Sequence, residues 1–432
     1  MPAIQTVYPR PLFNESNILD LDPPQGAGQF IKNHFFWADN KDVLQSWSIT
    51  DKTQAIKLIY IDPPFMSQMH YHSLKEHSDI RAFQDKWQPE AYLDMLYPRL
   101  LLMKQVLAAD GSIFVHVDWH VSHYVHMLLD EVFGPENFIN EIVWCYSGGG
   151  NSRRHLQRKH DLIFWYGRSP AYTFHPPHRP YTQGTLARGL TAVKGEKYKL
   201  SREGALLQDW WTDINKILSP TAYENVKYPT QKPRQLLKRI INMASNPGDL
   251  VADFFAGSGT TAEVSNELGR SWILCDNSPL ALQTTISRLA QADSPPFAIY
   301  AQSDPLSQAL SETSSSAARL RMKNVTVQAN GADRFWVSLG IDYYQPEVLP
   351  ENWDPAQFAA FIEFWEIDPD YNDKVFTSQY QLFRSPKQKA KRLPLNILLS
   401  LPRKKTYKIA VKLYDIFARQ HLQIMEFNPE HS

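Results

Sequence analysis

A carboxylate, two prolines and an aromatic side chain follow one another at the end of a short apolar run. The residues are Asp62, Pro63, Pro64 and Phe65, and the run before them is 58–61. Proline cannot continue the hydrogen bonds of a strand and fixes its own φ, so these residues are held stiffly where the strand ends. Asp62 and the proline carbonyls can accept hydrogen bonds from an amine, and Phe65 offers a flat face to a planar base. An edge turn capped by the aspartate would give the same four letters, because short motifs recur by chance.

A glycine-rich turn between a predicted strand and a predicted helix could hold a nucleotide-type cofactor. The strand covers residues 250–255, and Gly257 and Gly259 follow it where the helix begins. Glycines let the backbone approach a ligand closely, and the free N–H groups at a helix N-terminus face that ligand. The third glycine of a dinucleotide fingerprint is missing, which disfavours NAD. Asp276 ends the next strand about 20 residues past the glycines, where an acidic side chain binds ribose hydroxyls.

The two motifs together predict a nucleoside cofactor and an amine-bearing base bound at one sheet. Residues 255–261 with Asp276 form the first site, and residues 62–65 form the second. The cofactor site carries no pyrophosphate signature, and the neighbouring cup accepts an amine. This combination points to S-adenosylmethionine as the cofactor and to methyl transfer as the chemistry.

Hydrophobic periodicity predicts the strands and helices that must position these motifs. Apolar runs of strand length alternate with segments of helical spacing, which favours an α/β domain built on a mainly parallel sheet. The predicted strands cover residues 35–38, 58–61, 112–118, 138–146, 162–166, 250–255 and 271–276. The predicted helices cover residues 42–47, 90–109, 121–133, 235–244 and 256–268.

Changes in composition divide the chain into six segments. The boundaries follow Pro- and Gly-rich stretches, a basic and aromatic insert, and a Ser- and Ala-rich stretch. In order, we predict an N-terminal arm without regular structure (1–31), a catalytic half (32–166), a target-recognition insert (167–229), a cofactor-binding half (230–295), a linker (296–321) and a small β-rich C-terminal domain (322–432). Residues 66–86 carry no apolar period and are predicted to form a mobile loop over the site.

Composition limits the class of protein and its compartment. Of 432 residues, 43% are hydrophobic and 21% are charged, as in soluble globular proteins. Lys+Arg and Asp+Glu both number 45, so binding to nucleic acid must come from local basic patches. Cys145 and Cys275 lie in apolar runs and are predicted to be reduced core thiols. With no signal pattern, no membrane-spanning run and no metal-ligand spacing, we predict a cytoplasmic protein without a metal.

Three motifs in a defined order resemble the β class of DNA amino-methyltransferases. The segment 255–261 (FAGSGTT) resembles the AdoMet-binding motif of that family, 62–65 (DPPF) its catalytic motif, and 230–233 (TQKP) the segment that precedes the cofactor motif. The segments 128–134 (LLDEVFG) and 408–418 (KIAVKLYDIFA) also resemble the modification subunits of Type III restriction systems. The resemblance implies a Rossmann-like AdoMet-dependent methyltransferase sheet, circularly permuted so that the catalytic half precedes the cofactor half.

The resemblance also implies roles for individual residues. The catalytic residues would be Asp62, Pro63, Pro64 and Phe65. The cofactor-binding residues would be Asp39, Thr230, Lys232, Asp253, Phe255, Gly257, Gly259, Thr260 and Asp276. The glycine-rich turn would wrap the methionine end of the cofactor, with Thr230 and Lys232 closing over it. Asp39 would accept from the adenine amine of the cofactor, and Asp276 would bind the ribose.

The resemblance favours adenine in double-stranded DNA as the target. Cytosine-amine enzymes of this family usually carry Ser where Asp62 stands, and members often carry Tyr where Phe65 stands. The acidic pair of the family after the strand that ends at Asp118 is here replaced by Asp118-Trp119-His120. The expected reaction flips the adenine out of the duplex and transfers the methyl group directly, without a covalent enzyme intermediate.

Other substrates and partners stay open at this point. The basic residues expected to contact DNA are Arg153, Arg154, Arg179, Arg188 and Lys194. Alternative functions are a cytosine-N4 DNA methyltransferase, an RNA or protein amine methyltransferase, and a non-catalytic DNA-binding subunit. A separate restriction or specificity subunit and a second copy of the chain are the further partners that the resemblance raises.

Overall fold

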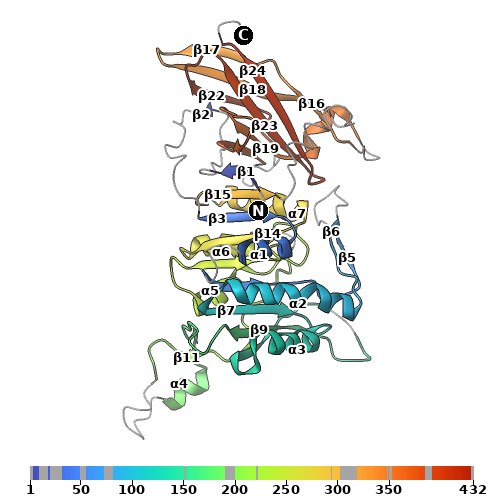
Figure 1. Cartoon of the computed structure of the whole chain (residues 1–432), viewed down its shortest axis with the longest axis vertical. Helices are drawn as coiled ribbons and strands as arrows, with labels where there is room; N and C mark the ends of the chain where they lie inside the picture. The colour runs from blue at the N-terminus through green and yellow to red at the C-terminus, as the bar shows by residue number, and fades with distance from the viewer. Residues whose placement is uncertain are drawn as a thin grey trace.

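A computed structural model describes most of the chain. The described residues are 3–8, 18–19, 32–48, 55–72, 81–149, 152–189, 200–219, 222–292, 294–301, 319–347, 349, 353–384 and 392–429. None of the described helices is both long and apolar enough to cross a membrane. Figure 1 shows an elongated molecule in which the C-terminal β-sheets lie at one end and helix α4 projects at the other.

The centre of the molecule is a mixed sheet of eleven strands, ordered β12-β8-β9-β7-β4-β13-β14-β3-β15-β1-β20. The six strands from β7 to β15 run parallel, whereas β9 pairs antiparallel with both β7 and β8, and β1 pairs antiparallel with β15. The bounds are β1 Ala3–Tyr8, β3 Asn33–Trp37, β4 Ile56–Ile61, β7 Leu107–Val117, β8 Phe138–Cys145, β9 His160–Gly167, β12 Trp210–Trp211, β13 Leu250–Asp253, β14 Ser271–Asp276, β15 Phe297–Ala301 and β20 Phe376–Thr377.

Helices cover both faces of this sheet. One apolar core packs the first three helices against β4 and β7, and a second packs α5 and α6 against the other face. The helices are α1 Asn40–Ser48, α2 Pro89–Val106, α3 Ser122–Phe133, α4 Gln183–Gly189, α5 Arg234–Ala244, α6 Thr260–Glu267 and α7 Pro279–Gln291, with 3-10 turns at Pro135–Asn137 and Pro355–Phe361. All six residues of β4 are buried because helices lie on both sides of it. The predicted α/β fold with a mainly parallel central sheet is therefore confirmed.

The C-terminal β-rich domain is also confirmed, and it consists of two facing sheets. One sheet has the order β16-β18-β22-β2 with β17 beside β18, and the other has the order β21-β19-β23-β24. Apolar residues from both sheets share one core. The bounds are β2 Ile18–Leu19, β16 Arg319–Met322, β17 Thr326–Asn330, β18 Arg334–Gln345, β19 Ile362–Asp368, β21 Tyr380–Phe383, β22 Asn396–Pro402, β23 Tyr407–Asp415 and β24 Gln420–Phe427.

Two sequence-based expectations are wrong in part, and both concern segments whose partners lie far away in the chain. The predicted irregular arm contains β1, which pairs with β15, and β2, which pairs with β22. The predicted mobile loop contains the two-stranded hairpin β5 His70–His72 and β6 Arg81–Gln84. Local composition hid these strands because their hydrogen bonds come from distant strands or from a short hairpin without an apolar period.

The segment boundaries need one adjustment, and one cysteine is less buried than expected. Strand β15 belongs to the central sheet although it lies within the predicted linker, while residues 302–318 of that linker fall outside the described part. The division into domains otherwise stays a prediction. Cys275 is a buried free thiol, whereas the free thiol of Cys145 is only partly buried at the end of β8.

The recognition insert adds small elements to the edge of the sheet. Strand β12 pairs with β8, and β10 His178–Arg179 pairs with β11 Ala205–Leu206. In Figure 1, β11 and α4 lie together at the end of the molecule farthest from the C-terminal sheets. The insert therefore extends the central sheet on the catalytic side rather than on the cofactor side.

Candidate active site

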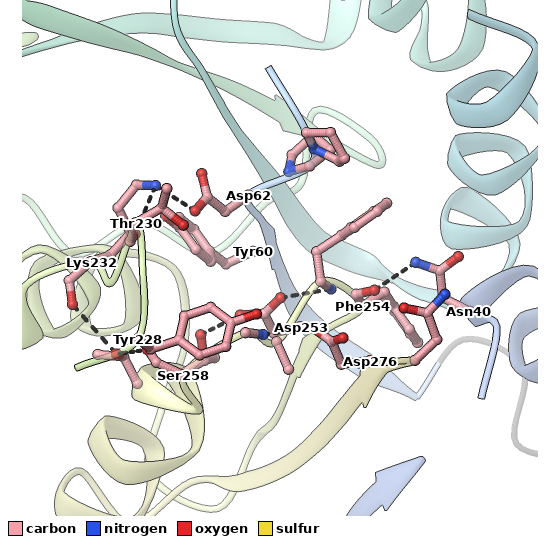
Figure 2. Close-up of a pocket in the computed structure, with 18 of the residues that line it drawn as sticks. Asn40, Tyr60, Asp62, Tyr228, Thr230, Lys232, Asp253, Phe254, Ser258 and Asp276 are labelled. Atoms are coloured by element: carbon pink, nitrogen blue, oxygen red, sulfur yellow. Dashed lines mark hydrogen bonds and ion pairs between the residues drawn. The ribbon is translucent and has the colours of Figure 1, made fainter. Parts of the chain in front are cut away.

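A cavity of about 360 Å³ opens at the carboxyl ends of the parallel strands. Open α/β sheets bind ligands at this edge, because the loops that leave adjacent strands meet there. The cavity is lined by the residues after β3, β4, β13 and β14, and by the segment 228–232. Figure 2 shows side chains from these segments facing one another across the cavity. The predicted catalytic and cofactor motifs are thus brought to one place.

Asp62 has one paired and one unpaired carboxylate oxygen. Its Oδ2 pairs with the ammonium group of Lys232, while its buried Oδ1 has no hydrogen-bond partner among the described residues. Phe65 lies alongside, with its ring stacked 6.1 Å from the ring of His116. A buried acceptor without a donor is costly, and because Asp62 lines the cavity, a group that enters the cavity can satisfy this oxygen.

The loop after the catalytic motif is fixed by Asp85. The carboxylate of Asp85 accepts the backbone N–H groups of Met66 and Ser67 at 2.8 and 2.9 Å, and the Ser67 hydroxyl at 2.5 Å. Met66 and Gln68 both have positive φ, at 56° and 62°. Such backbone angles are unfavourable for residues other than glycine and persist only where surrounding contacts impose them. Asp85, which is 1% exposed, supplies those contacts.

A buried network lies beneath the catalytic motif. His116 contacts the Tyr60 hydroxyl through Nδ1 at 2.9 Å and Asp161 through Nε2 at 3.2 Å, and the Tyr146 hydroxyl donates to Asp161 at 2.9 Å. Burial by itself raises the pKa of Asp161, but the hydrogen bond and charge of His116 outweigh it and leave that pKa below its usual value. The network therefore keeps the Asp161 carboxylate ionised beneath Asp62 and Phe65.

The glycine-rich turn depends on its two glycines. Gly257 and Gly259 adopt φ values of +49° and +72°, which L-residues rarely adopt. A Cβ at Gly259 would lie 2.6 Å from the hydroxyl oxygen of Thr285, and one at Gly257 would lie 3.1 Å from the Tyr228 ring. Glycine is therefore required at both positions.

Two carboxylates hold this turn by their hydrogen bonds. Asp253 accepts from the Phe255 N–H at 3.0 Å and from the Thr261 hydroxyl at 2.6 Å. Asp276 accepts from the Gly257 N–H at 2.9 Å and from the Ser278 N–H at 2.8 Å. Burial raises the pKa of Asp253 to about 7, and burial also raises the pKa of Asp276.

Every predicted catalytic and cofactor-binding residue lines the cavity except Gly259, which packs against Thr285 instead. Asp39 does so in a bidentate ion pair with Arg99, with both Oδ···Nη2 distances at 2.9 Å. Thr230 adopts φ 61°, an outlier for a β-branched residue, and its hydroxyl donates to the Pro229 carbonyl. Lys232 reaches the catalytic carboxylate, so it belongs to both halves of the site. The roles assigned to these residues stay predictions.

Sequence reasoning missed several residues of the site. Tyr228 is buried, and its ring packs on the turn at Gly257; its place just upstream of TQKP, with Pro229 between, is the signal that could have found it. His116 lies in the strand next to β4, so sheet neighbourhood could have predicted it. Arg99 comes from the middle of α2, where nothing in the local sequence marks it as a cavity residue.

The predicted DNA-contacting residues are only partly described. Arg153 and Arg154 are exposed in the loop after β8. Arg179 donates to the Gln208 side chain at 3.0 Å, which holds it within the insert. The side chain of Arg188 and the whole of Lys194 lie outside the described residues. Within the described ranges, no group of three or more His, Cys, Asp or Glu side chains forms a metal site.

Comparisons with known proteins find relatives named as DNA methyltransferases and as a restriction-modification subunit. The Type II methyltransferase M.EcaI of Enterobacter cloacae is 29% identical over 326 residues, covering 61% of this chain and 71% of that protein. The DNA adenine methyltransferase YhdJ of Escherichia coli K12 is 26% identical, covering 51% of this chain and 71% of its own length. The Type III StyLTI Mod subunit of Salmonella typhimurium LT2 is 24% identical, and this chain spans about half of it, 54%.

Two solved structures were also found at lower identity. The M1.HpyAVI–SAM complex is 18% identical with a TM-score of 0.41, covering 59% of this chain and 98% of that one. PvuII DNA methyltransferase (cytosine-N4-specific) is 17% identical with a TM-score of 0.41, covering 60% and 86%. The family model described as DNA methylase (N6_N4_Mtase) matches residues 56–287, which is more than half of the chain. The chain therefore belongs to this family of DNA methylases.

Proposed function

We propose that this protein transfers a methyl group from S-adenosylmethionine to the 6-amino group of adenine at a specific site in double-stranded DNA. The observation that carries the proposal is the buried, unpaired Oδ1 of Asp62 beside the Phe65 ring. The carboxylate provides an acceptor for an amine, and the ring provides a stacking surface for the base that bears it. A carboxylate at this position supports adenine over cytosine as the target.

The residues of the glycine-rich turn fit the proposed cofactor. Gly257 lines the cavity without a side chain of its own, and Asp276 lines it from the end of the neighbouring strand. Phe255 and Thr260 line the same wall. When bound, S-adenosylmethionine supplies an electrophilic methyl group on a sulfonium, and it leaves as the neutral thioether S-adenosylhomocysteine.

The chain's own residues orient the amine and take up its proton. Asp62 and the Pro63 carbonyl accept hydrogen bonds from the amino group, which draws its lone pair out of conjugation with the ring. A new N–C bond forms from that lone pair, and the proton that the nitrogen loses passes to the Asp62 carboxylate and then to water. The base must leave the duplex to reach this cavity, as for other enzymes that act on a base.

DNA is the proposed substrate, and the partners follow from the relatives. Arg153 and Arg154 are exposed in the loop after β8, where they can contact phosphates. The StyLTI Mod subunit is named as part of a Type III restriction-modification enzyme, which supports a restriction subunit as a partner. We also propose that this chain forms a homodimer and acts in the cytoplasm.

The test is mass spectrometry of nucleosides from unmethylated duplex DNA incubated with the protein and S-adenosylmethionine. We expect N6-methyladenine with the wild type and none with Asp62→Ala, and sequencing of the product then maps the recognition site. Detection of N4-methylcytosine would support methyl transfer to DNA and would contradict adenine as the target base. No methylated nucleoside in DNA, but methyl transfer to RNA or protein, would overturn DNA as the substrate.

A further inference from the structure

Lys232 lies over the Phe65 ring, where the proposed function places the target base, and holds one of the two oxygens of Asp62. Its ammonium group pairs with Oδ2 of Asp62 and lies 5.1 Å from the centre of the Phe65 ring. Figure 2 shows this side chain extending from the segment 228–232 towards Asp62. The residue is 9% exposed, so this position is an interior one. Without a ligand, a lysine thus covers the ring on which the base would stack and pairs with Oδ2 of Asp62, while Oδ1 stays unpaired.

A neutral base amine is a weak competitor for this position. A hydrogen bond between two charged groups is roughly twice as strong as one between neutral groups. Removing the ammonium would also leave the buried carboxylate of Asp62 without its counter-charge. The target base can therefore displace Lys232 from the Phe65 ring only if another anion receives the ammonium group.

Few positively charged side chains line the cavity and could pair with an anionic group of a ligand. Among the described residues that line it, the positively charged ones are Arg99 and Lys232, and Arg99 is held by both oxygens of Asp39. Lys232 also adjoins the cofactor turn, since the Thr260 hydroxyl lies 3.4 Å from its carbonyl oxygen. The proposed cofactor carries an α-carboxylate, and Lys232 is the cation that the cavity can offer to it.

We propose that Lys232 is a placeholder that couples cofactor binding to entry of the target base. Without cofactor, its ammonium group neutralises Asp62 and covers Phe65. The α-carboxylate of the bound cofactor draws the ammonium away, and the Phe65 ring and Oδ2 of Asp62 then become available to the base. This inference rests on the proposed function and adds an order of binding to it, with cofactor before base. Lys232 is a positioning residue in this scheme.

The test follows base flipping by fluorescence of 2-aminopurine placed at the target position of the mapped recognition site. With wild-type protein, we expect the fluorescence to rise only when S-adenosylhomocysteine is added. 5′-Methylthioadenosine, which keeps the adenosine and lacks the α-carboxylate, should leave it low. Lys232→Met should give high fluorescence without any cofactor and should bind S-adenosylhomocysteine about 10- to 100-fold more weakly, as expected for loss of a charge-assisted bond.

Matched variants separate this role from a structural one. Lys238→Met also removes a lysine, but one that pairs with Glu267 on the surface of α5, so it should behave as the wild type. Lys232→Arg should retain the cofactor dependence because it retains the charge. Thermal melting confirms that Lys232→Met is folded, and Lys232→Gln replaces it in every assay if it is not.

Two results would overturn the inference alone. One is base flipping by the folded Lys232 variant that still requires S-adenosylhomocysteine. The other is base flipping by the wild type with 5′-methylthioadenosine. Wild-type protein that methylates no DNA would instead overturn the proposed function, and the inference with it. Methylation of DNA by the same wild-type preparation is measured first, so the two failures are distinguishable.

Discussion

The carboxylates on the two sides of the cavity differ in their hydrogen-bond partners. On the cofactor side, Asp253 and Asp276 each use both oxygens to hold backbone and hydroxyl groups of their own loops. On the catalytic side, Asp62 keeps one oxygen unpaired and gives the other to a lysine from a different segment. The cofactor side is therefore built before any ligand arrives, whereas the catalytic side is left to be completed by the substrate.

The difference has a physical basis in what each side must do. A turn that wraps a cofactor needs a fixed backbone, because each N–H group that faces the ligand must already point at it. A group that activates an amine must exchange partners during the reaction, so it cannot be saturated by its own loop. The catalytic side obtains its rigidity from Asp85 instead, which fixes the loop without occupying Asp62.

The largest expected effect comes from removing the unsaturated carboxylate. We expect Asp62→Ala to lower kcat by at least about 10²–10³-fold, the usual cost of losing one group that stabilises developing charge. Calorimetric titration should find S-adenosylhomocysteine binding retained, because the cofactor turn is held by other residues. A loss of cofactor binding as large as the loss of kcat would show that the two sides are not separate.

A smaller loss of rate should follow when the catalytic loop is released. Asp85→Ala removes three hydrogen bonds to Met66 and Ser67, and displacement of a reacting group by about 1 Å can cost about 10²-fold. We expect kcat to fall by about 10- to 100-fold with cofactor affinity unchanged, measured by steady-state kinetics on DNA. An unchanged kcat would mean that Phe65 and its neighbours keep their positions without Asp85.

The cofactor side should respond in affinity rather than in rate. Gly259→Ala imposes a positive φ on alanine and places its Cβ 2.6 Å from the Thr285 hydroxyl oxygen, so we expect cofactor affinity to fall about tenfold or more. Gly331→Ala is the matched control, since Gly331 has φ +73° and nothing within 4 Å of the added Cβ. Titration calorimetry measures the cofactor affinity of both variants. Equal affinities for the two would show that glycine is not required at position 259.

The smallest effect is a change in how stability depends on pH. Burial raises the pKa of Asp253 to about 7, so between about pH 4 and 7 the folded chain keeps a proton that the unfolded chain has released. Stability contributed by this group is present at low pH and is lost as pH rises through 7. Asp253→Asn cannot titrate, so its Tm relative to the wild type should rise between pH 5.5 and 8. A difference in Tm that does not change with pH would contradict the raised pKa of Asp253.

Much of the fold could be predicted because its elements are encoded locally. Residues 271–276 were predicted as a strand and form β14, and the predicted strand 58–61 lies within β4. An apolar run of strand length and the helical spacing in residues 90–109 are local signals that need no knowledge of partners. The hairpin of β5 and β6 carries no such signal and was missed.

The candidate site was predictable to the extent that motifs specify it. DPPF and FAGSGTT name the residues at two strand ends, and parallel strands carry such ends to one edge of the sheet. Arg99 could not be found in this way, because it reaches the cavity from a helix packed on the face of the sheet. Its role depends on which turn of α2 lies beside β3, and that is decided by packing.

The sequence alone therefore determined the residue types at the two strand ends, the strands that carry them and the glycines where no Cβ fits. The tertiary structure alone decided that β1 joins β15, that Arg99 pairs with Asp39, and that Lys232 reaches Asp62 across the cavity. The reason is the range of the interactions. Hydrophobic period and backbone preference act between neighbours in sequence, whereas hydrogen bonds and ion pairs between distant segments exist only after the sheet has brought those segments together.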